Sequence, residues 1–379
     1  MSYQTRAQSP APHRLLACDG GGIRGIIAIE ILAKIEAELR AASGNPDLVL
    51  ADYFDYVAGT STGAIIATLV ALGYTVDDMR TFYIKSGAEM FQKARLWERF
   101  RTKFRDDALA RMLTDILGAK TTFGSDKLRC LLMMVLRNAT TDSPWPLSNN
   151  PGAKYNQPGA TGRNTDLPLW QLIRASTAAP TYFPPEEIHV GGKEFVFVDG
   201  GVTMFNNPAF QLFLMATSEP YRLCWETGVD KMLLVSVGTG ASANANSNLS
   251  PEEMNLLYNA GTIPSALMAA ALHEQDFLCR IFGKCLAGDV LDREIGDVIG
   301  QGIKSVPKLF TYVRYNAELS RPGLDTLGLG HIRPEHVQQM DSVEHVGEMQ
   351  QVGRAVAAQR VSAQHFEGFS PVPRAVAVG

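Results

Sequence analysis

Residues 59–63 have the sequence Gly-Thr-Ser-Thr-Gly, a G-x-S-x-G pattern between a strand-like run at 52–58 and an apolar, helix-like run at 64–72. A strand, a sharp turn and a helix in this order are typical of a nucleophile elbow, in which the turn exposes the serine. Small residues are needed beside it because a side chain there would collide with the tight turn. The helix would also direct its free N–H groups and the positive end of its dipole toward the serine. We therefore interpret Ser61 as a candidate nucleophile.

The rest of the chain alternates short buried runs with amphipathic runs. Residues 26–39 have apolar side chains at helical spacing, and Thr75 with Asp78 has the form of a capping box before a helix over 79–91. Such alternation predicts an α/β fold with a mostly parallel sheet covered on both faces. Strands are expected at 14–18, before Ser61, and at 130–137, 195–198, 232–237 and 308–315, and further helices at 167–175, from Ser250, and at 334–364.

The segment 138–166 is rich in Pro, Gly, Asn and Thr, which predicts a long surface loop. No sharp linker divides the first 330 or so residues. We therefore expect a flexible N-terminal segment at 1–13, a catalytic domain at 14–330, and a C-terminal helix and tail at 331–379, with a loose end from 368.

The chain has 379 residues, of which 46% are hydrophobic and 20% charged, and its formal net charge is −4. This balance gives no overall attraction to nucleic acid, which is therefore not expected as a partner. Without a secretory signal or a run long enough to cross a bilayer, a soluble, cytoplasmic protein is expected. The five scattered cysteines have no zinc-binding spacing, so reduced core thiols and no metal site are expected. They are Cys18, Cys130, Cys224, Cys279 and Cys285.

Residues 19–25, Asp-Gly-Gly-Gly-Ile-Arg-Gly, lie between the first predicted strand and the first predicted helix. One interpretation is an oxyanion hole, in which the N–H groups of Gly20, Gly21 and Gly22 point at the negative oxygen of a tetrahedral intermediate. The same residues satisfy the dinucleotide-binding G-x-G-x-x-G, which requires an acidic residue ending a second strand about 20 residues later. Asp47 is near that distance, but no strand precedes it. The oxyanion hole is favoured, and the nucleotide site and a structural turn stay open.

Asp199 ends the predicted strand at 195–198 and is followed by Gly200 and Gly201. A carboxylate at a strand terminus lies on the rim of a sheet, where loops build active sites. Taken alone, an Asp-Gly pair more often marks a turn in which the aspartate caps its own backbone. Asp199 becomes a catalytic candidate only together with Ser61 and the glycine-rich loop.

The glycine-rich loop, the G-x-S-x-G turn and Asp-Gly-Gly, in this order, resemble the patatin-like phospholipase family, and residues 175–184 and 236–240 also match its pattern. The resemblance extends over 19–240. It implies a three-layer α/β/α patatin-like fold with a mostly parallel central sheet, lipid acyl hydrolysis at a phospholipid membrane surface, a Ser–Asp dyad, and no cofactor or metal. It assigns the nucleophile to Ser61, the base to Asp199, and the oxyanion hole to Gly20, Gly21 and Gly22 with Arg24 beside them.

A triad with histidine stays open, because a Ser–Asp–His order needs only a histidine after Asp199. In a dyad, Asp199 must itself accept the proton of Ser61, and the usual pKa of an aspartate is too low for a base at neutral pH. We predict that burial beside the Ser61 hydroxyl raises the pKa of Asp199 into the useful range. The candidate histidines are His273, His331, His336, His345 and His365.

Residues 92–111 interleave basic and aromatic side chains, which fits a solvated amphipathic helix or a face that docks on anionic head groups. Some bacterial patatin-like enzymes are antiphage effectors activated by a cyclic dinucleotide, and this chain resembles them in length and at 141–147. A cyclic-dinucleotide activator, a peripheral location at the inner membrane and a homo-oligomer therefore stay open. So do a constitutive esterase or lipase, a non-catalytic storage or binding protein, and a dinucleotide-binding enzyme.

Overall fold

The computed structural model describes residues 2–91, 108–180, 183–241 and 256–370. Within them, nine strands form one sheet in the order β5-β6-β3-β2-β1-β7-β9-β8, with β4 paired to β3. The strands from β3 to β8 in this order are parallel, whereas β4, β5 and β6 are antiparallel to their partners. Their bounds are β1 His13–Cys18, β2 Tyr56–Thr60, β3 Leu131–Asn138, β4 Ser143–Ser148, β5 Glu186–Val190, β6 Lys193–Asp199, β7 Met232–Val237, β8 Gly283–Ala287 and β9 Phe310–Tyr315.

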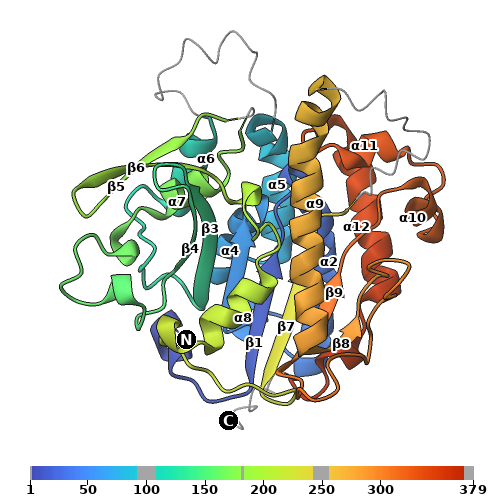
Figure 1. The fold of residues 1–379 in the computed structure, drawn as a ribbon, viewed down its shortest axis with the longest axis horizontal. Coiled ribbons are helices and arrows are strands. Elements are labelled where there is room, and N and C mark those ends of the chain that lie inside the picture. Colours follow the sequence, from blue (N-terminus) through green and yellow to red (C-terminus); the bar gives the residue numbers. More distant parts are fainter. Residues whose placement is uncertain (1, 92–107, 181–182, 242–255, 371–379) are drawn as a thin grey trace.

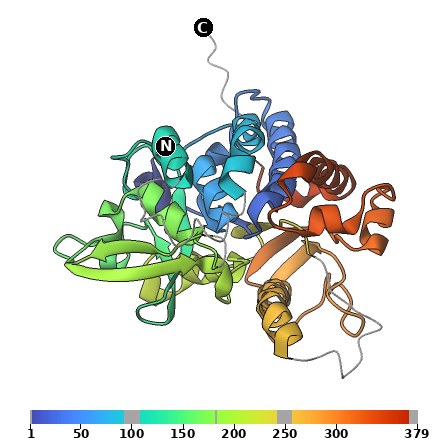
Figure 2. The ribbon, with the colours of Figure 1, turned by 90° about the horizontal axis from the view of Figure 1, so that it is seen from above.

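Helices cover both faces of this sheet (Figures 1 and 2). The α2 helix packs against α5 and α12 on one face, and α8 and α9 lie on the opposite face against β1, β7, β8 and β9. All residues of β2, β7 and β9 are buried, as expected for parallel strands between two helical layers. The predicted three-layer α/β/α fold is confirmed. The helices are α1 Tyr3–Ala7, α2 Gly25–Ser43, α3 Leu50–Tyr53, α4 Thr62–Ala71, α5 Val76–Phe91, α6 Ala108–Leu117, α7 Leu169–Ser176, α8 Ala209–Thr217, α9 Leu256–Phe282, α10 Arg321–Thr326, α11 Pro334–Gln338 and α12 Val346–Arg360.

The register of the central strands brings three chain segments to one edge of the sheet. Because β1 and β2 are parallel neighbours, the loop after β1 and the turn after β2 leave the sheet side by side. On the other side of β2, Thr60 lies opposite Val135 of β3, and the antiparallel β6 places Asp199 opposite Leu136. Val135 and Leu136 are adjacent in β3. The register therefore places Asp199 next to Ser61, the residue that follows Thr60.

Most predicted elements are confirmed. β7 has the predicted bounds, and β1, β3, β6, β9 and α7 differ from the prediction by no more than two residues at either end. The capping box is also present: the Thr75 N–H donates to Asp78 Oδ2 at 3.2 Å, and the Asp78 N–H donates to Thr75 Oγ1 at 3.1 Å. Across the described part of the chain, no helix has the length and apolar character that crossing a bilayer requires.

Two predictions about the central region are wrong. The segment 138–166 is not one continuous loop, because it contains β4, whose Pro144 and Pro146 argued against a strand. Among the described residues β4 pairs with β3 alone, and a free edge tolerates prolines because it needs no N–H donors. The run 52–58 is not all strand either. α3 occupies its start, and the Asp52 carboxylate caps that helix by accepting the Val49 N–H at 3.1 Å.

Two further predictions need correction. The run 334–364 is not one helix, because the chain leaves α11 after Gln338 and forms α12 only from Val346. In the break, the Met340 carbonyl accepts the Ile23 N–H at 2.9 Å, so a tertiary contact overrides the helical pattern. All five cysteines are free, but Cys224 is exposed and is not a core thiol.

Several predicted features fall outside the described residues. These are most of the basic and aromatic segment at 92–111, the helix start at Ser250, and the tail from 371. The division of the chain at 13/14 and 330/331 stays a prediction.

Candidate active site

Ser61 occupies a strained turn between β2 and α4. Its backbone has φ 55° and ψ −124°, a positive-φ conformation that a non-glycine residue rarely adopts, as a nucleophile elbow requires. The flanking glycines are needed for space. A Cβ on Gly59 would lie 1.9 Å from the Gly63 carbonyl oxygen, and a Cβ on Gly63 would lie 2.2 Å from the Cys18 carbonyl oxygen. The sequence-based explanation of these two glycines is confirmed.

Asp199 and Ser61 lie in direct contact. The Ser61 hydroxyl donates to Asp199 Oδ2 at 2.7 Å, and the Gly201 N–H donates to Asp199 Oδ1 at 2.6 Å. Burial raises the pKa of Asp199 to about 6, although the hydrogen bonds from Ser61 and Gly201 partly oppose this by favouring the carboxylate. The predicted direction of this pKa shift is confirmed. A carboxylate with this pKa can accept a proton near neutral pH.

Ser176, at the end of α7, connects the nucleophile turn to β3 by hydrogen bonds. Its Oγ accepts the Ser61 N–H at 3.0 Å and donates to the Val135 carbonyl of β3 at 2.7 Å. Two residues further on, the Ala178 carbonyl accepts the Asp199 N–H at 2.9 Å. The stretch 175–184 therefore positions both the nucleophile turn and the carboxylate. The sequence marked this stretch by its resemblance alone and did not indicate which side chain does the bracing.

The glycine-rich loop lies against the nucleophile turn. A Cβ on Gly25 would lie 2.5 Å from Thr62 Oγ1, which shows how closely the loop and α4 approach. The Gly20 N–H donates to the Asn206 carbonyl at 3.0 Å, whereas the Gly21 and Gly22 amides have no acceptor among the described residues. Those two N–H groups are therefore unpaired in this part of the structure.

Arg24 is partly buried behind this loop. Its Nη1 donates to the Gln338 carbonyl at 3.1 Å, and burial lowers its pKa to about 10 although Asp19 opposes the shift. Gly22 has φ +60°, and a Cβ there would lie 2.2 Å from the Met340 carbonyl oxygen. Glycine is thus required at that position for both conformation and space.

A buried ion pair anchors the start of the loop and was missed by the sequence analysis. Arg314 on β9 donates from Nη1 to Asp19 Oδ1 at 2.9 Å and from Nη2 to Asp19 Oδ2 at 2.5 Å. Its Nη1 also donates to Ser236 Oγ at 2.7 Å. Bidentate pairing of this kind fixes the relative orientation of the two side chains in addition to pairing their charges. Asp19 was visible in the glycine motif, but nothing in the sequence linked it to an arginine 295 positions away.

The candidate histidines bond elsewhere. Nδ1 of His365 lies 2.8 Å from the Tyr315 hydroxyl, and Nε2 of His331 lies 3.1 Å from Gln351 Oε1. His336 and His345 lie together, and His273 is an exposed residue of α9. No histidine in the described residues has a hydrogen bond to Ser61 or Asp199. Asp47, the acidic residue considered for a nucleotide site, lies in a turn rather than at a strand end.

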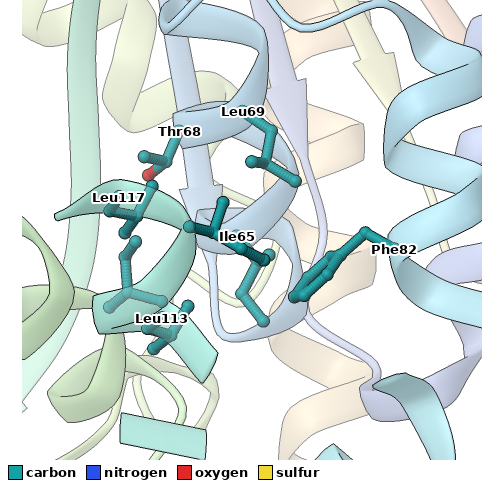
Figure 3. A pocket seen from close by; sticks show the side chains of 8 residues that line it. Ile65, Thr68, Leu69, Phe82, Leu113 and Leu117 are labelled. Atoms are coloured by element: carbon teal, nitrogen blue, oxygen red, sulfur yellow. The ribbon is translucent and has the colours of Figure 1, made fainter. Parts of the chain in front are cut away.

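A small apolar cavity of about 10 Å³ lies along α4 (Figure 3). It starts one helical turn after the nucleophile, at Ile65, whose N–H bonds to the Ser61 carbonyl at 3.3 Å. Thr68 supplies the polar side chain of its lining, and that hydroxyl is occupied by the Ala64 carbonyl at 2.7 Å. The cavity is lined by Ile65, Thr68, Leu69, Phe82, Leu113, Ile116, Leu117 and Ile173.

Comparison with known proteins gives matches to one family model, to curated relatives and to solved structures. A family model described as patatin-like phospholipase matches residues 16–213. Patatin-T5 from Solanum tuberosum is 28% identical over 256 residues, covering 63% of this chain and 63% of the relative. A cGAMP-activated phospholipase from Vibrio cholerae is 29% identical over 242 residues, covering 60% of this chain and 64% of the relative. The solved structure of VipD from Legionella pneumophila matches 93% of this chain and 67% of its own, with 13% identity and a TM-score of 0.37.

An α/β protein that places a serine hydroxyl in contact with a buried carboxylate has two of the parts of a serine-dependent acyl-transfer site. The chain belongs to the patatin-like phospholipase family, a family of lipid-ester hydrolases, since the family model matches 198 of its 379 residues, from 16 to 213. It spans less than two thirds of the length of the two relatives named above.

Proposed function

We propose that this chain is a lipid acyl hydrolase that cleaves fatty-acyl esters of phospholipids with Ser61 as nucleophile and Asp199 as base. The observation that carries the proposal is the 2.7 Å hydrogen bond from the Ser61 hydroxyl to the buried Asp199 carboxylate, whose pKa is raised to about 6. Membership in a family of lipid-ester hydrolases supports the same substrate class.

The proposed acylation step follows from this geometry. Asp199 Oδ2 takes the Ser61 proton while Ser61 Oγ forms a bond to the ester carbonyl carbon. The negative oxygen that develops faces the free N–H groups of Gly21 and Gly22, and donors of this kind supply a large part of the stabilisation of such an intermediate. The bond to the leaving alcohol then breaks, and that alcohol takes the proton from Asp199.

Deacylation uses the same groups. Asp199 takes a proton from water, the water oxygen attacks the acyl carbon, and the bond to Ser61 Oγ breaks as the proton returns to the serine.

In this proposal Gly20 and Arg24 shape the loop, because the Gly20 N–H is occupied by Asn206 and Arg24 holds the Gln338 carbonyl. Among the proposed oxyanion residues, donation to the substrate therefore falls to Gly21 and Gly22.

The test compares wild type with Ser61→Ala on phospholipid vesicles and on a soluble short-chain ester. Loss of a serine nucleophile is expected to lower kcat by at least about 10⁴-fold. Ser125→Ala is the matched control, because Ser125 lies ahead of β3, at the opposite edge of the sheet, and its hydroxyl accepts a local N–H from Lys127. Equal hydrolysis by wild type and Ser61→Ala would contradict the proposal. Inactivity of the wild type on both substrates would favour a non-catalytic binding protein.

The pH profile tests the role of Asp199 separately. As the pH falls through about 6, Asp199 gains a proton and can no longer accept the one from Ser61, so kcat/KM should fall by about tenfold per pH unit below that point. The measurement is the initial rate on the soluble ester between pH 4 and 8, with circular dichroism as the control for folding. A rate unchanged down to about pH 4 in the folded protein would remove Asp199 as the base.

We further propose that a cyclic dinucleotide activates the enzyme, as part of a defence against phage. Support comes from the 29% identical relative from Vibrio cholerae, which is named as a cGAMP-activated phospholipase. Titration of the lipase assay with cyclic dinucleotides should raise the rate at a saturable concentration. A rate that is already maximal without nucleotide would favour the constitutive esterase or lipase.

A further inference from the structure

A cluster of three potential metal ligands lies in the C-terminal segment that contacts the glycine-rich loop. It consists of His336, His345 and Glu348. His336 lies on α11, His345 ends the short turn Val343–His345, and Glu348 lies in the first turn of α12. One ligand atom from each lies within 4.8 Å of the others. His336 Nδ1 is 2.9 Å from Glu348 Oε2, and His345 Nδ1 is 3.8 Å from Glu348 Oε1. All three side chains are partly buried.

Ordinary hydrogen bonding accounts for only half of this arrangement. The His336 contact has the length of a hydrogen bond, but the His345 contact at 3.8 Å does not. The two imidazole rings nevertheless stack 3.7 Å apart with an interplanar angle of 7°, and Nδ1 of each ring lies within 4 Å of the same carboxylate. Ligand atoms on a tetrahedral zinc ion lie about 3.3 Å from one another, given metal–ligand bonds of about 2.0–2.1 Å. The observed distances fall on both sides of that value.

We propose that His336, His345 and Glu348 bind a divalent transition-metal ion, with zinc as the probe. Two imidazoles and one carboxylate are ligands that zinc prefers, and a fourth position would be left for water. Binding needs both histidines neutral and replaces the proton that now lies between His336 and Glu348. The site does not depend on the proposed chemistry of Ser61 and Asp199.

The metal would fix the segment that supports the glycine-rich loop. Between His336 and His345, the Gln338 carbonyl accepts from Arg24 and the Met340 carbonyl accepts from the Ile23 N–H. These contacts hold the two residues that directly follow Gly21 and Gly22. A metal that ties α11 to α12 closes this segment at both ends, so it should reduce the opening of the loop.

Binding is tested on untagged protein stripped with a chelator, by calorimetric titration with zinc and by the visible absorption of bound cobalt. About one zinc ion per chain is expected, with a Kd in the micromolar range or tighter. Glu348→Gln keeps the size and a hydrogen bond to His336 but loses the charge. This variant and His336→Ala should each raise the zinc Kd by about 100-fold or more. His189→Ala is the matched control, because His189 pairs with Glu194 at 3.0 Å in an exposed position and should leave the Kd unchanged.

Hydrogen exchange tests the link to the loop. Zinc should slow exchange of the Ile23 amide in wild type and not in Glu348→Gln, while thermal melting in chelator checks that the variant is folded. Wild-type protein that binds no zinc at up to about 1 mM, or equal zinc Kd values for wild type and Glu348→Gln, would overturn the site. Zinc binding that leaves the exchange of Ile23 unchanged would overturn the link to the loop.

Discussion

The nucleophile turn and the glycine-rich loop lie side by side, but the structure supports them in different ways. The turn is held by close backbone packing and by neighbours within the span that the family model matches. The loop is held mainly from beyond that span. The contacts of the turn come from Cys18, Ser176 and Asp199, and those of the loop come from Asn206, Thr239, Arg314 and Met340.

This difference shows which contacts of the site can be read from a local motif and which depend on the complete fold. Every residue that shapes the turn around Ser61 is small or polar and stands in a segment with a recognisable pattern. The loop depends on a strand and a C-terminal segment that follow residue 213, where the family model ends. The C-terminal third therefore has a structural role in the site, and the four predictions that follow test each kind of support.

The largest effect is expected at the turn. Gly63→Ala would place a Cβ 2.2 Å from the Cys18 carbonyl oxygen, a backbone atom at the buried end of β1 that cannot move aside. The free energy of unfolding should fall by about 4 kcal/mol or more, measured by urea denaturation. Gly347→Ala, in the first turn of α12 with nothing within 4 Å of the added Cβ, is the matched control and should be neutral or slightly stabilising. Similar stabilities for the two variants would contradict the close packing of the turn.

The loop anchor comes next. Arg314→Met leaves the buried Asp19 carboxylate without its bidentate partner and should destabilise the protein by about 3–5 kcal/mol. Adding Asp19→Asn removes the stranded charge, so the double variant should recover part of this loss in a denaturation cycle. Additive losses in the double variant would mean that the two residues do not act as a pair.

Sequence reasoning reached the turn, the dyad and the fold class because each depends on local pattern. Small residues mark the sharp turn at Ser61, and buried apolar runs mark the parallel strands. The same reasoning missed β4, because Pro144 and Pro146 argue against a strand unless its free edge is known. It also joined α11 to α12, because helical spacing cannot show that Met340 is needed by Ile23.

Long-range pairing is the part that the sequence could not supply. The partner of Asp19 is an arginine on a strand whose position in the sheet follows only from the complete topology. The sequence did not indicate the cluster of His336, His345 and Glu348 for the same reason. The spacing of these residues matches no familiar metal motif, and only the turn between α11 and α12 brings them together.

The variant Asp199→Asn should show that the buried, ionised carboxylate of Asp199 lowers the free energy of unfolding. Because the folded-state pKa of Asp199, about 6, lies above its usual 3.8, the folded protein binds the proton more tightly than the unfolded chain. The ionised carboxylate therefore lowers stability above about pH 6, and this penalty disappears as the pH falls toward 4. The variant has no charge to bury, so it should gain about 2–3 kcal/mol at pH 7 and almost nothing at pH 4. Thermal melting at the two pH values measures this, and an equal gain at both would mean that ionisation is not the cause.

The smallest effect is expected at the brace behind the turn. Ser176→Ala removes the hydroxyl that accepts the Ser61 N–H and donates to the Val135 carbonyl, and it leaves both of these groups without that partner. The loss should be about 1–2 kcal/mol in urea denaturation, with faster hydrogen exchange of the Ser61 amide. Ser218→Ala, whose hydroxyl has no hydrogen bond to any described residue, is the matched control and should change neither quantity. If Ser176→Ala lowered stability but left the exchange of Ser61 unchanged, α7 would be stabilised by this serine without holding the nucleophile turn. The contrast between a locally held turn and a remotely held loop would then be sharper, because the turn would be held by glycine packing and the contact with Asp199.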